Sequence, residues 1–549
     1  MPSTVEGVGS DQLVRMAARI DDWFLTAAER GNPATSIDRR RTDGRAWTEG
    51  NLVRPLVHGS AYYARLLAAL TTLAPGDMVL LAEWRGDPDE RLDGPGAEVG
   101  QVLAELVGKG VQVRGLLWRS HVTKAFSERQ NLHLGDVVNQ AGGEILLDER
   151  VRGPGSHHQK LVVVHRADPD QDVAFAGGID LCHGRRDDPR HQGDAQTIEM
   201  NPRYGPRPPW HDVQLELHGP AVGDLAFTFR ERWQDPIPLD HRNPVRARIT
   251  RRAHQPRRPT PLPPMRRDPG PAGPHAVQVL RTYPSKHPRF PFAPRGERSI
   301  ARAYGKALGR AQRLIYLEDQ YLWSAEIARV LAEALDRAAA LQLVAVLPPY
   351  PESPSRLAGA PERIGRQRAL GLLREAGGDR VAVYELENEA ANPIYVHAKV
   401  CVIDDVWAAV GSDNLNRRSW THDSELACAV LDPTRDQRAP LDPAGLGDGA
   451  RVFARTLRLG LWREHLGRGP GQDEDLLDPA TGVVAWREAA GRLAAWHRGG
   501  RRGPRPPGRA LPHATDSVPW WAAWWAAPAY LLVVDPDGRP LRLRLTRRF

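Results

Sequence analysis

Hydrophobic and polar positions along this chain follow two different periods, and stretches of one period alternate with stretches of the other. Segments with apolar residues at every third or fourth position predict helices, and the short apolar runs that follow them are typical of buried strands. Four helix-then-strand pairs stand out: 59–70 with 77–84, 98–110 with 111–118, 297–311 with 313–319, and 324–340 with 341–348. This alternation predicts an α/β fold in which the sheets are largely parallel.

Two stretches rich in proline and arginine interrupt the pattern and suggest how the chain is divided. Residues 236–274 predict an extended linker, and residues 497–513 set off a Trp-rich end segment. With 549 residues the chain also exceeds the usual size of one domain. The predicted organisation is an N-terminal extension (1–49), a first half (50–235), the linker (236–274), a second half (275–470) and a basic, Trp-rich C-terminal segment (471–549).

Neither end of the sequence contains a segment that we expect to cross a membrane. The first 23 residues lack the apolar core of a signal peptide, and the longest uncharged apolar run, 518–534, is short and holds two prolines. We expect this run to form a Trp-rich helix and then a strand, with a hairpin turn at 535–540. Its tryptophans fit a buried helix stripe, which we favour, or a membrane interface. The expectation is a soluble cytoplasmic protein, or one peripheral to a membrane.

Charge and cysteine content place only weak limits on the possible partners and on the compartment of the protein. The net charge of +8 suits an anionic partner but does not identify one. Arginine supplies most of the cations, which draws attention to the six lysines, at 109, 124, 160, 286, 306 and 399. The three cysteines, at 182, 401 and 428, provide no disulfide framework and fit a reducing compartment.

One strand-like segment, YVHAKVCVIDD at 395–405, carries two polar side chains among apolar ones. Because side chains alternate faces along a strand, His397 and Lys399 lie on the same face. The opposite face is apolar and reads as a core face: Val396, Ala398, Val400 and Val402. Two cation-forming groups side by side on an anchored strand predict an anion between them.

The same arrangement occurs a second time, 239 positions earlier in the chain. His158 and Lys160 share a strand face in the sequence HHQKLVVVH. Each copy is followed by an apolar segment that ends in small residues, at 173–180 and at 406–414, and then by an acidic residue at another strand. These acidic residues are Asp212 and Glu425. The chain is therefore predicted to contain an internal duplication, with one copy in each half.

These residue types suit attack on a phosphodiester. One imidazole can attack phosphorus while the other, protonated, supplies the proton that the leaving alcohol needs. Two lysines and a side-chain amide, that of Asn414, can hold the non-bridging oxygens. Asp212 and Glu425 can keep the imidazoles in the reactive tautomer. This chemistry requires no metal and no other cofactor.

At these motifs the chain resembles a known family. HAKVCVID (397–404) followed by GSDNLNRRS (411–419) is similar to the HxKxxxxD signature of the phospholipase D superfamily. HHQKLVVV, GGIDLCHGRRD, PWHDVQLELHGPAV and IYLEDQYLW are similar to segments of eukaryotic-type phospholipase D catalytic regions, and the resemblance covers most of 50–465. It implies two α/β sandwich halves with mixed, largely parallel sheets, related by a pseudo-two-fold axis. The His158 and His397 strands would then face each other across one cleft.

The resemblance also implies roles for individual residues. The family's nucleophile is usually the histidine of the first half, His158 here, and His397 is then the general acid and base. Asp180 stands where the second copy has Asn414, and Gln320, like Glu318, fits either a strand-end cleft position or a capping position. The catalytic set predicted in this way is His158, Lys160, His397, Lys399, Asn414, Asp212, Glu425 and Asp404. The predicted substrate-binding set is Asp180, Ser412 and Gln320.

The first copy departs from the family pattern at one position, since His165 stands where an aspartate is expected. That position lies on the strand face opposite His158 and Lys160, so we expect it to shape the strand end rather than take part in chemistry. The histidines of the first half lack the close spacing of zinc ligands, and we predict no metal site from them: His157, His158, His165, His183 and His211.

The leading functional hypothesis is a phospholipase D that hydrolyses a glycerophospholipid or transfers its phosphatidyl group to an alcohol through a phosphohistidine. The alternatives are a cardiolipin synthase-type phosphatidyl transferase, a nuclease of the same superfamily, and a non-catalytic scaffold. Transferases of that type usually carry N-terminal membrane spans, the nucleases are often short single-motif homodimers, and only His165 favours a scaffold. The expected partner is a phospholipid at a membrane surface, with nucleic acid not the first choice, no obligate protein partner and a monomeric chain.

Overall fold

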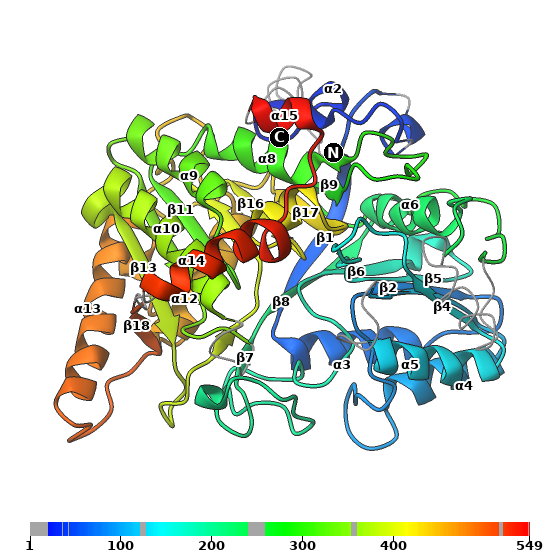
Figure 1. Ribbon diagram of the computed structural model, residues 1–549, viewed down its shortest axis with the longest axis horizontal. Helices are drawn as coiled ribbons and strands as arrows, with labels where there is room; N and C mark the ends of the chain where they lie inside the picture. Colours follow the sequence, from blue (N-terminus) through cyan, green and yellow to red (C-terminus); the bar gives the residue numbers. More distant parts are fainter. Residues whose placement is uncertain are drawn as a thin grey trace, which may run out of the picture.

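The structure is a computed structural model that describes residues 20–35, 37–41, 43–120, 128–239, 258–352, 359–514, 520–546 and 548–549. Figure 1 shows two lobes side by side, with the first half of the chain on the right, in blue to teal, and the second half on the left, in green to orange.

The two halves contain the same arrangement of six strands. In the first half the order is β8-β6-β5-β2-β3-β4, and in the second it is β17-β16-β15-β11-β12-β13. The first set is β2 (Met78–Glu83), β3 (Gln112–Trp118), β4 (Glu144–Asp148), β5 (Leu161–His165), β6 (Val173–Gly177) and β8 (Val213–His218). The second set is β11 (Leu314–Glu318), β12 (Gln342–Val346), β13 (Val381–Leu386), β15 (Val400–Ile403), β16 (Trp407–Gly411) and β17 (Glu425–Leu431). The predicted duplication is confirmed by this topology.

Two long strands join the halves into one sheet. β1 (Thr48–Val57) pairs with β8, β9 (His275–Tyr283) pairs with β17, and β1 and β9 pair with each other. Two short strands, β10 (Glu297–Arg298) and β18 (Ala510–Pro512), add to β9 and β13. The predicted α/β class is confirmed as a mixed sheet.

Parallel pairing in this sheet is less extensive than the sequence pattern suggests. It is confined to β2-β3-β4 and β11-β12-β13, where helices connect successive strands, and the strands between these two groups are antiparallel. Short connections such as the one from β5 to β6 can only join antiparallel neighbours, because a parallel pair needs a long crossover.

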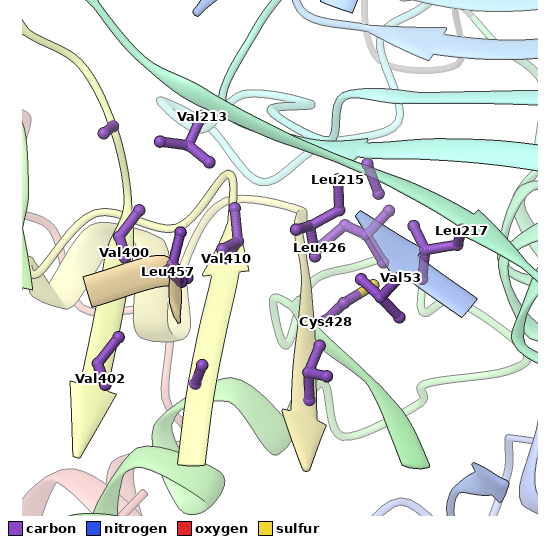
Figure 2. Close-up of a cluster of buried hydrophobic side chains, with 14 of the residues drawn as sticks. Val53, Val213, Leu215, Leu217, Val400, Val402, Val410, Leu426, Cys428 and Leu457 are labelled. Carbon is purple, nitrogen blue, oxygen red and sulfur yellow. The ribbon is translucent and has the colours of Figure 1, made fainter. Parts of the chain in front are cut away.

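Helices cover both faces of the sheet, and one core is common to the two halves. The outer faces are covered by α3 (Gly59–Thr71), α4 (Val99–Gly108) and α5 (Glu128–Gln140) in the first half and by α8 (Ser299–Leu308), α9 (Ala325–Arg337) and α10 (Ala360–Gly377) in the second. The common core also contains residues of α6 (Ala221–Trp233), α12 (Val452–Leu466) and α13 (Pro479–Arg498). Figure 2 shows Leu215 and Leu217 of the first half beside Leu426 and Cys428 of the second. This shared packing fixes the two histidine segments relative to each other.

The C-terminal segment differs from its sequence prediction. After α14 (Trp520–Ala529) the chain continues as one π-helical turn, Tyr530–Val534, instead of the expected strand, and residues 535–540 lead to α15 (Leu541–Leu545) instead of into a hairpin. The turn is held by tertiary contacts, because Tyr530 Oη donates to Trp323 O at 2.8 Å and Arg418 Nη1 donates to Val533 O at 3.1 Å. Trp524 is 81% exposed, so it does not belong to a buried stripe; the side chains of Trp520, Trp521 and Trp525 lie outside the described residues.

The linker prediction can be followed over part of its length. Residues 258–274 contain neither helix nor strand and contact the first half, where Trp233 Nε1 donates to Thr260 O at 2.7 Å. Residues 240–257 of the linker, and residues 1–19 of the N-terminal extension, lie outside the described part of the chain. Of the helices that the structure describes, none has both the length and the apolar composition to cross a membrane.

Candidate active site

The two histidines lie just before strands rather than within them. His397 and Lys399 fall in the break between β14 (Tyr395–Val396) and β15, so the single strand expected over 395–402 is divided in two. At the break, His397 N and Ala398 N both donate to His211 O of the first half. The predicted alternation of faces is nevertheless confirmed, since the apolar face lies in the shared core: Val396, Ala398, Val400 and Val402.

Each imidazole is hydrogen-bonded to a carboxylate from the opposite half of the chain. His158 Nδ1 lies 2.9 Å from Glu425 Oε2, and His397 Nδ1 lies 2.7 Å from Asp212 Oδ2. The backbone follows the same crossed pattern. His158 N donates to Ser424 O at 2.9 Å and His397 N donates to His211 O at 2.8 Å. The structure therefore brings the two predicted histidines and the two predicted carboxylates together, and neither half contains a complete pair.

The two carboxylates are held by different neighbours at equivalent positions. Ser412 Oγ donates to Glu425 Oε2 at 2.5 Å. Its counterpart in the first half is Gly178, where a Cβ atom would collide with Asp212 Oδ1, so the small residue leaves room for that carboxylate. Burial raises the pKa of both carboxyl groups, that of Glu425 to about 8.

The two lysines are buried beside the histidines, each with its own polar partner. Lys160 Nζ lies 3.3 Å from Asp180 Oδ2, and Lys399 Nζ donates to Gln320 Oε1 at 3.3 Å. Burial lowers the pKa of Lys399 to about 8. Asp180 and Gln320, predicted to bind substrate, thus hold the lysines. Buried Asn414 Oδ1 has no hydrogen-bond partner among the described residues.

Both imidazoles are neutral near pH 7 in this arrangement. Burial, followed by the positive charges of Lys160 and Lys399, lowers the pKa of His158 well below its usual value. Burial, followed by the positive charges of Lys399, Arg185 and Lys160, does the same to the pKa of His397. A neutral imidazole is a nucleophile and a base. It becomes an acid only when an anion nearby offsets the lysine charges.

His158 and Asn414 line a pocket of about 300 Å³. The His158 side chain is 14% exposed, whereas that of His397 is 6% exposed, so the first-half imidazole is the more accessible one. Aromatic side chains form much of the wall: Trp84, Trp118, Tyr321 and Trp323. The π-helical turn lies at the same pocket through Val533 and Val534, and Leu531, Leu532 and Val533 of this turn are exposed on the surface.

Asp404 is not brought to this site, although it belongs to the predicted catalytic set. Its carboxylate accepts hydrogen bonds at 2.8 Å from the backbone N–H groups of Gln312, Arg313 and Leu314. It lies seven positions beyond His397, which is roughly 20 Å along an extended chain. Through these contacts Asp404 holds the backbone in place at the start of β11.

His165, the departure in the first copy, occupies the corresponding place at the end of β5. Its Nδ1 atom lies 2.6 Å from Asp172 Oδ2, and Arg166 N donates to Asp172 Oδ1 at 2.7 Å. The expectation that this position shapes the strand end agrees with these contacts.

Several residues near the site were missed by the sequence analysis. The wall residues Trp84 and Trp118 stack with their centroids 5.7 Å apart, and no spacing connects them to the histidine motifs. Glu318 was predicted to be either a strand-end cleft residue or a capping residue, yet it is buried and its Oε2 lies 2.7 Å from Nε2 of His211, the residue before Asp212. The pairing of His211 with Glu318 could not be predicted because 107 positions separate them.

Comparisons with known proteins match the two halves separately. A family model described as "Phospholipase D" matches residues 87–255, and one described as "Cardiolipin synthase, PLD-like domain" matches residues 304–439. Phospholipase D alpha 1 of Brassica oleracea var. capitata is 26% identical over 515 residues, and that of Ricinus communis is 27% identical over 514 residues. In both cases 72% of this chain is covered, and the chain spans 61% of the relative's length.

Among solved structures, a phosphatidylserine synthase of Haemophilus influenzae Rd KW20 matches with a TM-score of 0.47 and 14% identity. The match covers 70% of this chain and 82% of that one.

Proposed function

Since the chain belongs to the phospholipase D superfamily, we propose that it cleaves the phosphodiester of a glycerophospholipid, releasing the head group and passing the phosphatidyl group to water or to an alcohol. The observation that carries the proposal is the crossed pairing of His158 with Glu425 and of His397 with Asp212, beside two buried lysines. Both matching family models and the matching relatives are named for enzymes that act on phospholipids, which supports this substrate class.

The proposed reaction has two steps. His158 Nε2 attacks phosphorus, a P–N bond forms and the P–O bond to the head group breaks, while His397 donates a proton from Nε2 to the leaving oxygen. Water or an alcohol then attacks the phosphohistidine, His397 takes its proton, and the P–N bond breaks. When ionised, each carboxylate accepts a hydrogen bond from Nδ1–H of its imidazole and so leaves Nε2 as the reacting atom.

The lowered pKa values fit this division of roles. His158, neutral and more exposed to the pocket, is suited to attack. When an anionic phosphodiester lies between the lysines, its charge offsets theirs and raises the pKa of His397, so that this ring carries the proton that the leaving group needs. The ammonium groups of Lys160 and Lys399 and the Nδ2–H groups of Asn414 would donate hydrogen bonds to the non-bridging oxygens.

The pocket wall favours a lipid over a nucleic acid. Aromatic rings line it, and exposed aliphatic side chains of the π-helical turn, Leu531, Leu532 and Val533, continue from it onto the surface. Apolar surface of this kind suits acyl chains. A nuclease site would instead present cations along the path of a polyanion.

Mixed phospholipid vesicles with a little ethanol, and no added metal, test the proposal. We expect phosphatidic acid together with phosphatidylethanol, no product from His397→Ala, and unchanged product from the control His165→Asn, which alters a histidine remote from the pocket. Cleavage of DNA without any lipid product would contradict the proposal and favour the nuclease alternative. Phosphatidyl transfer to glycerol-type acceptors with no hydrolysis would favour the cardiolipin synthase-type reaction.

A further inference from the structure

A second group of chemically active side chains lies behind Asp212, outside the reaction site proposed above. It consists of His58, His191, His211 and Glu464, and one nitrogen or oxygen atom from each lies within 4.8 Å of all the others. All three histidines are fully buried. They come from the first half, before α3, in a loop and at the end of β7 (Trp210–His211), whereas Glu464 comes from α12 of the second half. The cluster therefore spans the junction of the two halves.

The distances in this cluster fit those between the ligands of one ion. Glu464 Oε2 lies 3.0 Å from His58 Nε2, while Glu464 Oε1 lies 3.0 Å from His191 Nε2 and 3.8 Å from His211 Nδ1. Four ligands on a tetrahedral zinc ion, with bonds of about 2.0 Å, lie about 3.3 Å apart. His211 Nδ1 is buried and has no hydrogen-bond partner among the described residues, so it is available to a ligand.

The ring nitrogens on the other side of two of these histidines are already engaged. His211 Nε2 lies 2.7 Å from Glu318 Oε2, and His191 Nδ1 lies 3.0 Å from Trp210 O. Metal-binding histidines usually have this second contact, to a carboxylate or a backbone carbonyl, because it fixes the tautomer and the ring orientation. Glu318 is itself held by His465 Nε2 at 2.7 Å and by Tyr316 Oη at 2.5 Å.

The charges around the cluster also leave a place for a cation. Three carboxylates contact its imidazoles, those of Glu464, Glu318 and Asp187, the last 3.6 Å from His191 Nδ1. Among the described residues, Arg509 is the guanidinium that faces them, 3.5 Å from Glu464 Oε1. Buried carboxylates in excess over cations are costly, and a divalent ion would balance them.

We propose that His58, His191, His211 and Glu464 bind one divalent transition-metal ion, with Zn²⁺ the best match, which links the two halves of the chain. Three imidazoles and one carboxylate form a ligand set that suits zinc. The ion touches no substrate. Its effect on the site is indirect, because it fixes the position of His211. This residue precedes Asp212, and its carbonyl oxygen accepts the hydrogen bond of His397 N. The proposed phosphohistidine chemistry remains free of metal, so this inference stands apart from the proposed function.

Metal content and stability test the proposal without reference to activity. Full-length protein is purified without chelator and analysed by mass spectrometry for bound metals, then stripped with dipicolinate and titrated with Zn²⁺ or Co²⁺. We expect about one zinc per chain, a rise in Tm on adding Zn²⁺ to the stripped protein, and the visible absorption of tetrahedral Co²⁺. His191→Gln and Glu464→Gln should lose the Co²⁺ band and the rise in Tm.

A matched control is His183→Gln, which alters another histidine of the first half. His183 pairs with Asp89 at 3.1 Å and does not belong to the cluster, so this variant should keep the ion. Folded wild-type protein that takes up neither Zn²⁺ nor Co²⁺ would overturn the proposal, even if the variants fail to fold. Uptake that persists in both His191→Gln and Glu464→Gln would overturn it as well, because the ion would then lie elsewhere.

Discussion

The first and second halves of the chain have the same strand order, and the histidine–lysine motifs they carry agree in residue type at one end and differ at the other. His158 and Lys160 have counterparts in His397 and Lys399, and the carboxylates cross between the halves. At the other end, Asp404 accepts three backbone hydrogen bonds, whereas His165 relies on Asp172 for a carboxylate in that region. The aspartate of the motif thus stabilises the backbone at the end of the strand, and in the first half His165 stands in its place.

A second difference between the halves concerns the partners of the two lysines and separates the roles of the two copies. Asp180 places a carboxylate beside Lys160, whereas the amide of Gln320 is the partner of Lys399. Lys160 therefore already has a counter-charge, and Lys399 has more charge available for a bound phosphodiester. Together with the greater exposure of His158, this makes the symmetric scaffold chemically asymmetric.

The largest expected effect comes from the histidines. His158→Ala and His397→Ala should each lower kcat by at least about a thousandfold, because each removes an essential partner in bond making or proton transfer. A substrate with a good leaving group, such as a p-nitrophenyl phosphodiester, separates them. His397→Ala should still give a burst of nitrophenol from this substrate, and His158→Ala should give none. A burst from His158→Ala would reverse the assignment of roles.

Next come the crossed carboxylates. Glu425→Gln and Asp212→Asn should each reduce kcat by about a hundredfold to ten-thousandfold, since the ring then loses the partner that fixes its tautomer. Comparable losses in steady-state assays would support equivalent functions across the halves. Full activity in either variant, with unchanged Tm, would break the comparison.

Smaller still is the expected effect of pH. Lys399 has a lowered pKa of about 8 and is charged below it, so kcat/KM should fall as the pH rises through about 8 and phosphate binding weakens. Glu425, with a raised pKa of about 8, ionises over the same pH range, and its ionised form should raise kcat/KM because it holds the His158 ring in the reactive tautomer. Lys399→Arg separates the two, because guanidinium stays charged and should move the alkaline limb to higher pH. If the alkaline limb stays at the same pH in Lys399→Arg, the loss of activity at high pH belongs to another group.

The smallest catalytic effects should come from the far end of the motif. Asp404→Asn should lower the free energy of unfolding by about 2–3 kcal/mol, since the amide cannot accept all three hydrogen bonds, while kcat changes little in the folded protein. His165→Asp should lower the free energy of unfolding by about 1–3 kcal/mol, because it replaces the hydrogen bond to buried Asp172 with a second carboxylate, while kcat changes little. Denaturant titration measures both. A large loss of kcat in folded Asp404→Asn would place this residue in the chemistry after all.

Local pattern predicted much of this molecule, and contacts between distant residues account for what it missed. Helical and strand periods predicted α3, β2, α4 and β3, and the repeated histidine and lysine indicated the duplication. The crossed partners could not be read from the sequence, because 267 positions separate His158 from Glu425 and 185 separate His397 from Asp212. The histidine cluster behind Asp212 was missed for the same reason, with 406 positions between His58 and Glu464.

The helical turn at 530–534 shows the other limit of local pattern. Its apolar, β-branched sequence favours a strand, but hydrogen bonds from Arg417 and Arg418 to its backbone hold it in helical form.

The central claim is that the two halves form one site in which His158 attacks and His397 transfers protons. Mass spectrometry of enzyme quenched in acid-free conditions during turnover of a short-chain phospholipid tests it most directly. The account predicts a phosphatidyl adduct on the peptide that contains His158, which disappears in His158→Ala. In His397→Asn the adduct should accumulate when the substrate is a phosphatidyl p-nitrophenyl ester, because this leaving group needs no proton while attack by water or alcohol is slowed. An adduct on His397 instead, or turnover with no adduct in any of these proteins, would contradict it.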